Sequence, residues 1–113
     1  MNATALLPVA KSYAELVARF RWRIPVFFNI AEACCDRWAD GTGRIALVHV
    51  TPDGREEMVT FYALREASAR LANVLRAQGV ERGDRVAILL PQGPEAAIAH
   101  LAAYRLAAIA VTL

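Results

Sequence analysis

Two short apolar segments with a helical segment between them determine the predicted fold class of this chain. The apolar segments are residues 85–90 and 108–113, and the helical segment runs from Glu95 to about Ala107. After Arg85 the first apolar segment is continuous rather than alternating, which is typical of a strand buried on both faces of a parallel sheet. A strand, a helix and a strand of these lengths predict a right-handed βαβ crossover. We therefore expect an α/β fold.

Two capping patterns near the start of the chain predict short helices. Ser12 with Glu15, and Asn29 with Glu32, have the spacing of capping boxes. The first helix is expected to run to about residue 20, and the second to end at the glycines of residues 41–43. One face of the second helix is expected to carry Ile30, Ala33, Cys34 and Trp38.

An extended connector and a β-hairpin are expected next to these helices. Residues 21–28 contain Pro25 and are predicted to be extended. Residues 45–51 are rich in β-branched side chains and predict a strand, residues 51–54 have the turn sequence Thr-Pro-Asp-Gly, and residues 56–61 are predicted to form a second strand. This arrangement is typical of a β-hairpin.

The longest predicted helix follows the hairpin. Thr60 can cap a helix that runs to Gln78, and Gly79 is suited to end it. Its expected apolar face, at three-and-four spacing, consists of Leu64, Ala67, Leu71, Val74, Leu75 and Gln78.

These elements divide the chain into a helical lead-in, residues 1–44, and an α/β portion, residues 45–113. A central parallel strand needs helices over both faces and neighbours along both edges. Two parallel strands, a hairpin and four helices do not complete that arrangement. The sequence is therefore expected to be an incomplete portion of a larger domain.

Composition excludes several classes of protein. Hydrophobic residues make up 57% of the 113 residues and charged residues only 21%, which excludes a disordered tail. The net charge of +2 is too balanced for an electrostatic nucleic-acid binder. The most apolar stretch, residues 101–113, is interrupted by Arg105 and is too short to span a bilayer. We expect a cytoplasmic protein without a membrane span or a nucleic-acid partner.

The loop of residues 90–95 is a candidate phosphate site because it follows a strand and opens a helix. However, it holds only one glycine, Gly93, and Pro94 removes an amide that could have bound an anion. Glu95 would repel a phosphate. A structural turn is therefore favoured over a nucleotide-binding loop.

The remaining candidates for chemistry favour structural roles. His49 and His100 have no second metal ligand at a suitable spacing, and neighbouring Cys34 and Cys35 cannot chelate one metal. Ser12 and Ser68 lack the setting of a nucleophile. The basic and aromatic residues 20–23 are expected to dock on a domain surface. We therefore assign no catalytic, cofactor-binding or metal-ligating residue to this chain.

An ordered series of short segments carries a family resemblance. GDRVAILLP at residues 83–91 is the most specific of them. The others are residues 28–32, 35–39, 60–61, 64–68, 72–75, 79–80, 95, 103–106 and 108–111. From about Tyr13 onward, this order and spacing resembles the first fifth of the adenylate-forming acyl-CoA synthetases, the AMP-dependent synthetase and ligase family. Within that family the chain is most similar to acetyl- and medium-chain acyl-CoA synthetases.

The resemblance implies a two-step ligase reaction. A carboxylate attacks the α-phosphate of ATP with Mg²⁺ to give an acyl-adenylate, and coenzyme A then displaces AMP. The family uses a Ser/Thr/Gly-rich phosphate loop and essential lysines, but this chain has no such loop and only one lysine, Lys11. The family also usually has glycine and proline where this chain has Ala107 and Thr112, and acidic residues in place of Tyr62 and Ala63.

Three hypotheses about function follow, of which a nucleotide-binding enzyme that works from the loop of Gln92 and Gly93 is the weakest. The first is the N-terminal part of an acyl-CoA synthetase, inactive alone, whose partner is the remainder of the synthetase chain. ATP, Mg²⁺ and CoA are then implied for the full enzyme and not for this chain. The second is a standalone small α/β binding or interaction module without catalysis.

Overall fold

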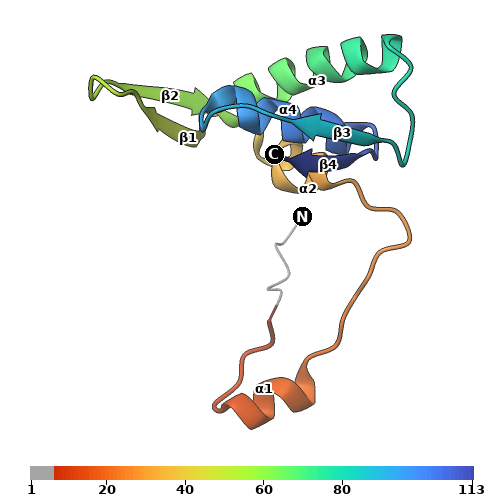
Figure 1. Ribbon diagram of the computed structural model, residues 1–113. Helices are drawn as coiled ribbons and strands as arrows, with labels where there is room; N and C mark the ends of the chain where they lie inside the picture. The colour runs from red at the N-terminus through yellow and green to blue at the C-terminus, as the bar shows by residue number, and fades with distance from the viewer. Residues whose placement is uncertain (1–6) are drawn as a thin grey trace.

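The computed structural model describes residues 7–113, so the first six residues of the predicted lead-in lie outside it. The helices are α1 (Tyr13–Arg19), α2 (Ile30–Cys34), α3 (Phe61–Ala77) and α4 (Pro94–Arg105), with a 3₁₀-helix, η1 (Asp36–Trp38). The strands are β1 (Ile45–Val50), β2 (Glu56–Thr60), β3 (Arg85–Ile88) and β4 (Ile109–Thr112). In Figure 1, α2 to β4 form one body, whereas α1 lies apart from it.

Side-chain caps begin the helices where the sequence predicts them. The Ser12 hydroxyl accepts from the Glu15 amide at 3.2 Å, and the Asn29 side chain accepts from the Ala31 amide at 2.9 Å. The Thr60 hydroxyl accepts from the Ala63 amide at 3.1 Å. These three helix starts are confirmed. A cap of this kind stabilises a helix by about 1 kcal/mol.

The second helix is shorter than expected, and its buried face is displaced. The helix ends at Cys34, and the backbone of Cys35 (φ −124°, ψ −61°) leads into η1. Ala31 and Cys35 are buried, whereas Ile30 and Cys34 are exposed. The predicted face was therefore wrong by one position, because Ala31, Cys35 and Ala39 are the residues that pack in the core.

The predicted β-hairpin is confirmed. Strands β1 and β2 pair in antiparallel register, with Val48 opposite Met58. In the turn, the Gly54 amide donates to the Thr51 carbonyl at 2.8 Å. The Thr51 hydroxyl donates to the Asp53 carboxylate and lowers the pKa of that group, and Arg55 adds to this shift.

Helix α3 has its predicted length, but two of its three buried side chains are small. Leu64, Ser68 and Ala72 are buried at a spacing of four residues, whereas Val74 is 56% exposed. Ala102 and Ala103 of α4 are fully buried, and α3 packs on α4. Small residues allow two helix backbones to approach closely, so the contact face of α3 is narrower than the apolar pattern predicted.

The parallel strand–helix–strand unit confirms the α/β fold. Strands β3 and β4 pair in parallel, with Val86 opposite Ala110, and α4 connects them. The prediction that the first of these strands is buried on both faces was wrong for this chain. Only Ile88 of β3 is buried, and the following Leu89 is 77% exposed. Helix α4 contacts both strands, and no other described element covers the two-stranded sheet from its far side (Figure 1).

Among residues 7–113, the core consists mainly of small side chains, and the largest fully buried ones are Cys35 and Ser68. Many large apolar side chains lie on the surface instead. Those of the β3–β4 region are Leu89, Leu90, Ile109, Val111 and Leu113. Large apolar side chains exposed on two paired strands are typical of a region that contacts other protein.

Ala107 provides a first prediction, because it ends α4 in a left-handed conformation. Its φ of 53° makes it the one non-glycine residue with positive φ in the described part of the chain. That conformation costs an alanine about 1 kcal/mol relative to glycine. We expect Ala107→Gly to raise the free energy of unfolding by about 1 kcal/mol in urea denaturation followed by circular dichroism.

Ala99→Gly, in the interior of the same helix, is the matched control. It should lower the free energy of unfolding by about 1 kcal/mol, because glycine is a poor helix former there. If Ala107→Gly is as destabilising as Ala99→Gly, the strain at residue 107 is not relieved by glycine and the prediction is wrong.

Candidate functional site

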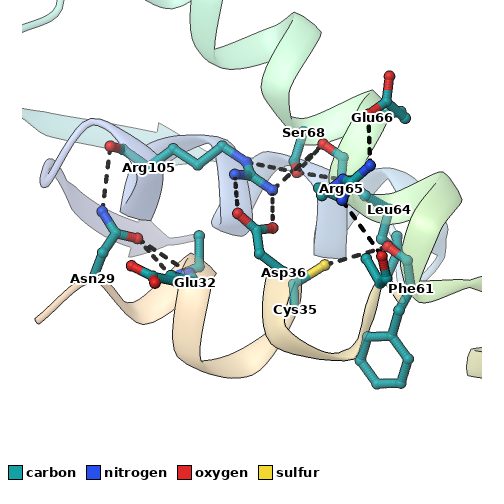
Figure 2. Close-up of polar contacts among 12 residues, drawn as sticks. Asn29, Glu32, Cys35, Asp36, Phe61, Leu64, Arg65, Glu66, Ser68 and Arg105 are labelled. Carbon is teal, nitrogen blue, oxygen red and sulfur yellow. Dashed lines mark hydrogen bonds and ion pairs between the residues drawn. The ribbon is translucent and has the colours of Figure 1, made fainter. Parts of the chain in front are cut away.

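A cluster of polar side chains from η1, α3 and α4 is centred on Arg105, the last residue of α4 (Figure 2). Its guanidinium forms a bidentate ion pair with Asp36 of η1, with N–O distances of 2.7 and 2.5 Å. The side chains are only 16% and 27% exposed. The hydrogen bonds to Asp36 raise the pKa of Arg105, so this arginine stays charged. A paired and hydrogen-bonded charge can be held in a poorly solvated place.

Ser68 connects this ion pair to α3. The Arg105 Nε donates to the Ser68 hydroxyl at 3.0 Å, and that hydroxyl donates to the Leu64 carbonyl at 2.6 Å. The Arg105 guanidinium also reaches the Arg65 carbonyl at 3.4 Å. Ser68 is fully buried, and no buried side-chain nitrogen or oxygen in residues 7–113 lacks a partner. The cluster therefore joins η1, α3 and α4.

Asn29 connects the start of α2 to the end of α4. Its side-chain oxygen caps α2, while its amide donates to the Tyr104 carbonyl at 3.1 Å and the Arg105 carbonyl at 3.4 Å. The last carbonyls of a helix have no partner within the helix. One asparagine thus satisfies both helix ends and holds them together.

Cys35 lies beside the ion pair. Its thiol donates to the Phe61 carbonyl at 3.5 Å. Burial raises the pKa of the Cys35 thiol, and the negative charge of Asp36 adds to that increase. The thiol is therefore neutral and is a poor nucleophile or metal ligand. Cys34 is exposed, so only Cys35 of the two neighbouring cysteines packs in the core.

An open depression of about 510 Å³ adjoins the cluster. Its polar lining includes Asn29, Glu32, Asp36, Asn73, Arg76 and Arg105. Two carboxylates and two guanidiniums balance in charge, and Asp36 and Arg105 are already paired with each other. None of these residues is a nucleophile activated by a neighbouring base. The arrangement suits the positioning of helices rather than a reaction.

The loop of residues 90–95 contains side chains that oppose anion binding. A methyl group placed on Gly93 would lie 3.2 Å from the Glu95 carboxylate and 3.7 Å from the His49 ring. The carboxylate therefore folds over the start of α4, where a phosphate would have to bind. The sequence predicted this repulsion from Glu95, but it did not predict that His49 of the hairpin lies at the same loop.

His100 and the two cysteines do not gather into a metal site. The His100 ring contacts the Ala96 carbonyl at 2.8 Å and the Thr112 hydroxyl at 3.0 Å, so it joins α4 to β4. In the described part of the chain, no three His, Cys, Asp or Glu side chains are placed to hold a metal ion. Nor does any helix there have the length and apolar composition needed to cross a membrane.

The aromatic segment of residues 20–23 does not dock on the body as expected. Phe20 and Trp22 pack edge to face on each other, with ring centroids 4.9 Å apart. Trp22 remains 76% exposed. The expectation of docking is therefore wrong within this chain, because no described element lies beside the segment (Figure 1).

A comparison with protein families identifies the wider architecture. The profile described as AMP-binding enzyme matches residues 35–113, which is more than half of the chain. The chain belongs to the AMP-binding enzyme family. The matched range begins at Cys35 and so includes the Asp36, Ser68 and Arg105 cluster. The resemblance drawn from the sequence is confirmed.

Individual relatives of this AMP-binding family chain are synthetases. The acetyl-coenzyme A synthetase of Caulobacter vibrioides is 41% identical over 100 residues, which cover 87% of this chain and 16% of the relative. That of Halorhodospira halophila is 44% identical over 84 residues, covering 72% and 13%. The crystal structure of Brucella canis acyl-CoA synthetase matches with a TM-score of 0.79 and 36% identity, covering 87% of this chain and 20% of that one. The chain thus spans about one sixth of the length of its curated relatives.

The sequence did not predict the Arg105 cluster, although two of its residues had been singled out for other reasons. Asn29 was noted as a cap, and Arg105 was noted as an interruption of an apolar stretch. A single arginine in a buried apolar segment requires a carboxylate partner. That signal could have directed attention to Asp36, but it could not have selected Asp36 from the other acidic residues.

A second prediction concerns the ion pair. Asp36→Asn leaves the Arg105 charge without its partner, so the free energy of unfolding should fall by about 2 kcal/mol. Combining Asp36→Leu with Arg105→Met removes both charges and should restore part of that loss. Urea denaturation of each variant measures these values.

Glu15→Gln is the matched control, because Glu15 and Arg19 form an exposed ion pair at 2.9 Å. Its removal should change the free energy of unfolding by less than about 0.5 kcal/mol. An Asp36→Asn effect no larger than that of Glu15→Gln would show that the Arg105 pair does not hold the fold.

A third prediction separates the two cysteines. Iodoacetamide at pH 8 should alkylate Cys34 at least about tenfold faster than Cys35, because the Cys35 thiol is buried and its pKa is raised. Mass spectrometry of peptides from timed samples measures both rates. In guanidinium the two rates should become similar, and equal rates in the native chain would contradict the structure.

Proposed function

We propose that this chain is the N-terminal part of an AMP-forming acyl-CoA synthetase and is inactive alone. In this proposal, residues 1–44 are a helical lead-in and residues 45–113 are an incomplete α/β portion of the AMP-binding domain. The complete enzyme converts a carboxylate, ATP and CoA to acyl-CoA, AMP and pyrophosphate in the cytoplasm. The observation that carries the proposal is the match to synthetases over 87% of this chain and only 16–20% of theirs.

The chemistry of the described residues supports the inactive part of the proposal. Activation of a carboxylate by ATP needs cationic groups and Mg²⁺ at the phosphates. The best-placed cation, Arg105, has both Asp36 oxygens as partners, and Glu95 lies over the start of α4. These residues do not suit a phosphate or Mg²⁺. ATP, Mg²⁺ and CoA would therefore be held by the remainder of the synthetase.

The role of this chain is then to position that remainder. The Arg105 cluster holds α2, η1, α3 and α4 in one arrangement, and β3 and β4 present apolar side chains outward. A standalone module would not be expected to expose so much apolar surface. This surface supports the synthetase proposal over the standalone module.

A fourth prediction tests the proposal with a chimera. Residues 1–113 replace the matching segment of the Caulobacter vibrioides acetyl-coenzyme A synthetase, and acetate-dependent ATP–pyrophosphate exchange is measured. We expect a rate within about tenfold of that relative, which corresponds to a loss of less than about 1.4 kcal/mol. The purified 113-residue chain alone should give no exchange.

The control is the Caulobacter enzyme with the same segment deleted, which should be inactive. Exchange by the isolated chain would overturn its proposed inactivity. A chimera that melts cooperatively but gives no exchange would overturn the assignment to a synthetase of this type.

A further inference from the structure

Residues 7–28, which we call the N-terminal arm, lie outside the body of the protein (Figure 1). Helix α1, within the arm, contains no buried residue. The large apolar side chains of the arm are unusually exposed, with Trp22 at 76%, Phe27 at 91% and Phe28 at 66%. Others that are exposed are Leu7, Val9, Tyr13, Val17, Ile24 and Val26.

The hydrogen bonds of the arm are all local. The Arg19 guanidinium donates to the Val9 carbonyl at 3.0 Å and to the Glu15 carboxylate at 2.9 Å. The Lys11 amide donates to the same carboxylate at 2.9 Å. These contacts and the Ser12 cap shape α1, but a seven-residue helix is marginal in water without tertiary packing. The arm therefore needs a surface to pack on.

The relatives indicate which surface that is. The matches to the Caulobacter and Brucella synthetases each cover 87% of this chain, a share that residues 29–113 alone are too few to supply. Both matches therefore extend into the arm. In the Brucella structure the matching part is only 20% of the chain, so most of that protein is available to cover it. The family profile begins at Cys35 and therefore does not include the arm. Part of the arm is nevertheless matched by these two synthetases.

We propose that the N-terminal arm docks on the remainder of the synthetase, the part of the enzyme that these 113 residues do not include. This inference rests on the proposed function. Burial of the exposed tryptophan and phenylalanines supplies the attraction, at about 25 cal/mol for each Å² of apolar surface removed from water. The arm then connects the body described here to the rest of the enzyme by packing on it.

The charges of the arm define the chemistry of the partner surface. Lys11, Arg19, Arg21 and Arg23 face only one carboxylate, Glu15, so the arm is strongly basic. In an extended segment, alternate side chains point to opposite sides. Phe20 and Trp22 pack edge to face and so share one side, whereas the Arg21 guanidinium turns back to the Ala18 and Phe20 carbonyls. The matching surface is an apolar strip bordered by aspartate or glutamate side chains.

A fifth prediction tests the arm by limited trypsin digestion. Arg19, Arg21 and Arg23 are cleavage sites in the isolated chain, where the arm is exposed. In the Caulobacter chimera, cleavage at these sites should slow by about tenfold or more, because cleavage needs the arm to open. Peptide mass spectrometry of timed samples measures both rates.

Two chimera variants separate docking from general destabilisation. Trp22→Ser with Phe27→Ser removes the apolar contacts and should restore rapid cleavage in the arm, while cleavage elsewhere is unchanged. Trp22→Phe with Phe27→Leu keeps apolar side chains and should keep the arm protected. Rapid cleavage in the conservative variant would overturn the apolar basis of docking.

The activity of the chimera distinguishes this inference from the proposed function. An active chimera with an arm cleaved as fast as in the isolated chain would overturn the docking and leave the function in place. A protected arm in an inactive chimera would support the docking and overturn the function. Protection in the isolated chain that increases with protein concentration would assign the arm to a second copy of this chain and overturn the inference.

Discussion

The bidentate ion pair between Arg105 and Asp36 is the interaction on which the rest of the body depends. It lies where η1, α3 and α4 meet, and it replaces the large apolar side chains that normally fill such a junction. An ion pair with little solvent costs desolvation energy, which further hydrogen bonds must offset. Ser68 and the Arg65 carbonyl supply these bonds, and the C-terminal position of Arg105 on α4 places a positive charge at the favourable end of the helix dipole.

Local signals predicted most of the elements, whereas their buried faces depended on contacts between distant residues. Ser12, Asn29 and Thr60 cap helices as expected because a cap involves only the next few residues. The face of α3 was not predictable in the same way, because Ser68 is buried through its bond to Arg105, 37 residues later. Of the candidate site, the sequence predicted Asn29 only as a cap, and it could not pair Arg105 with a particular carboxylate. The division at residue 44 stays a prediction.

The exposure of β3 and the backbone conformation of residue 107 both differ from what their sequences favour. The apolar run of residues 85–90 is the pattern of a strand covered on both faces, yet Leu89 and Leu90 are exposed in this chain. The sequence therefore encodes burial that residues 7–113 do not provide. Ala107 occupies a left-handed position that favours glycine. Both features lie at or next to the β3–β4 sheet, and the chain spans only 16% of the acetyl-coenzyme A synthetase of Caulobacter vibrioides.

Polar residues fix the interior of the body, whereas large apolar residues form its outer surfaces. The interior of the body is specified by hydrogen-bond geometry among Asn29, Asp36, Ser68 and Arg105, with mainly small side chains around them. The large apolar side chains are thereby left for the outer surfaces of the sheet and the arm. Hydrogen-bond geometry selects one arrangement of helices, because a bidentate pair tolerates little displacement. Apolar surface is not directional, so it supplies attraction to a partner but not orientation. In the proposed function, a body fixed by polar contacts can therefore present its apolar surfaces at a defined angle to the rest of a synthetase.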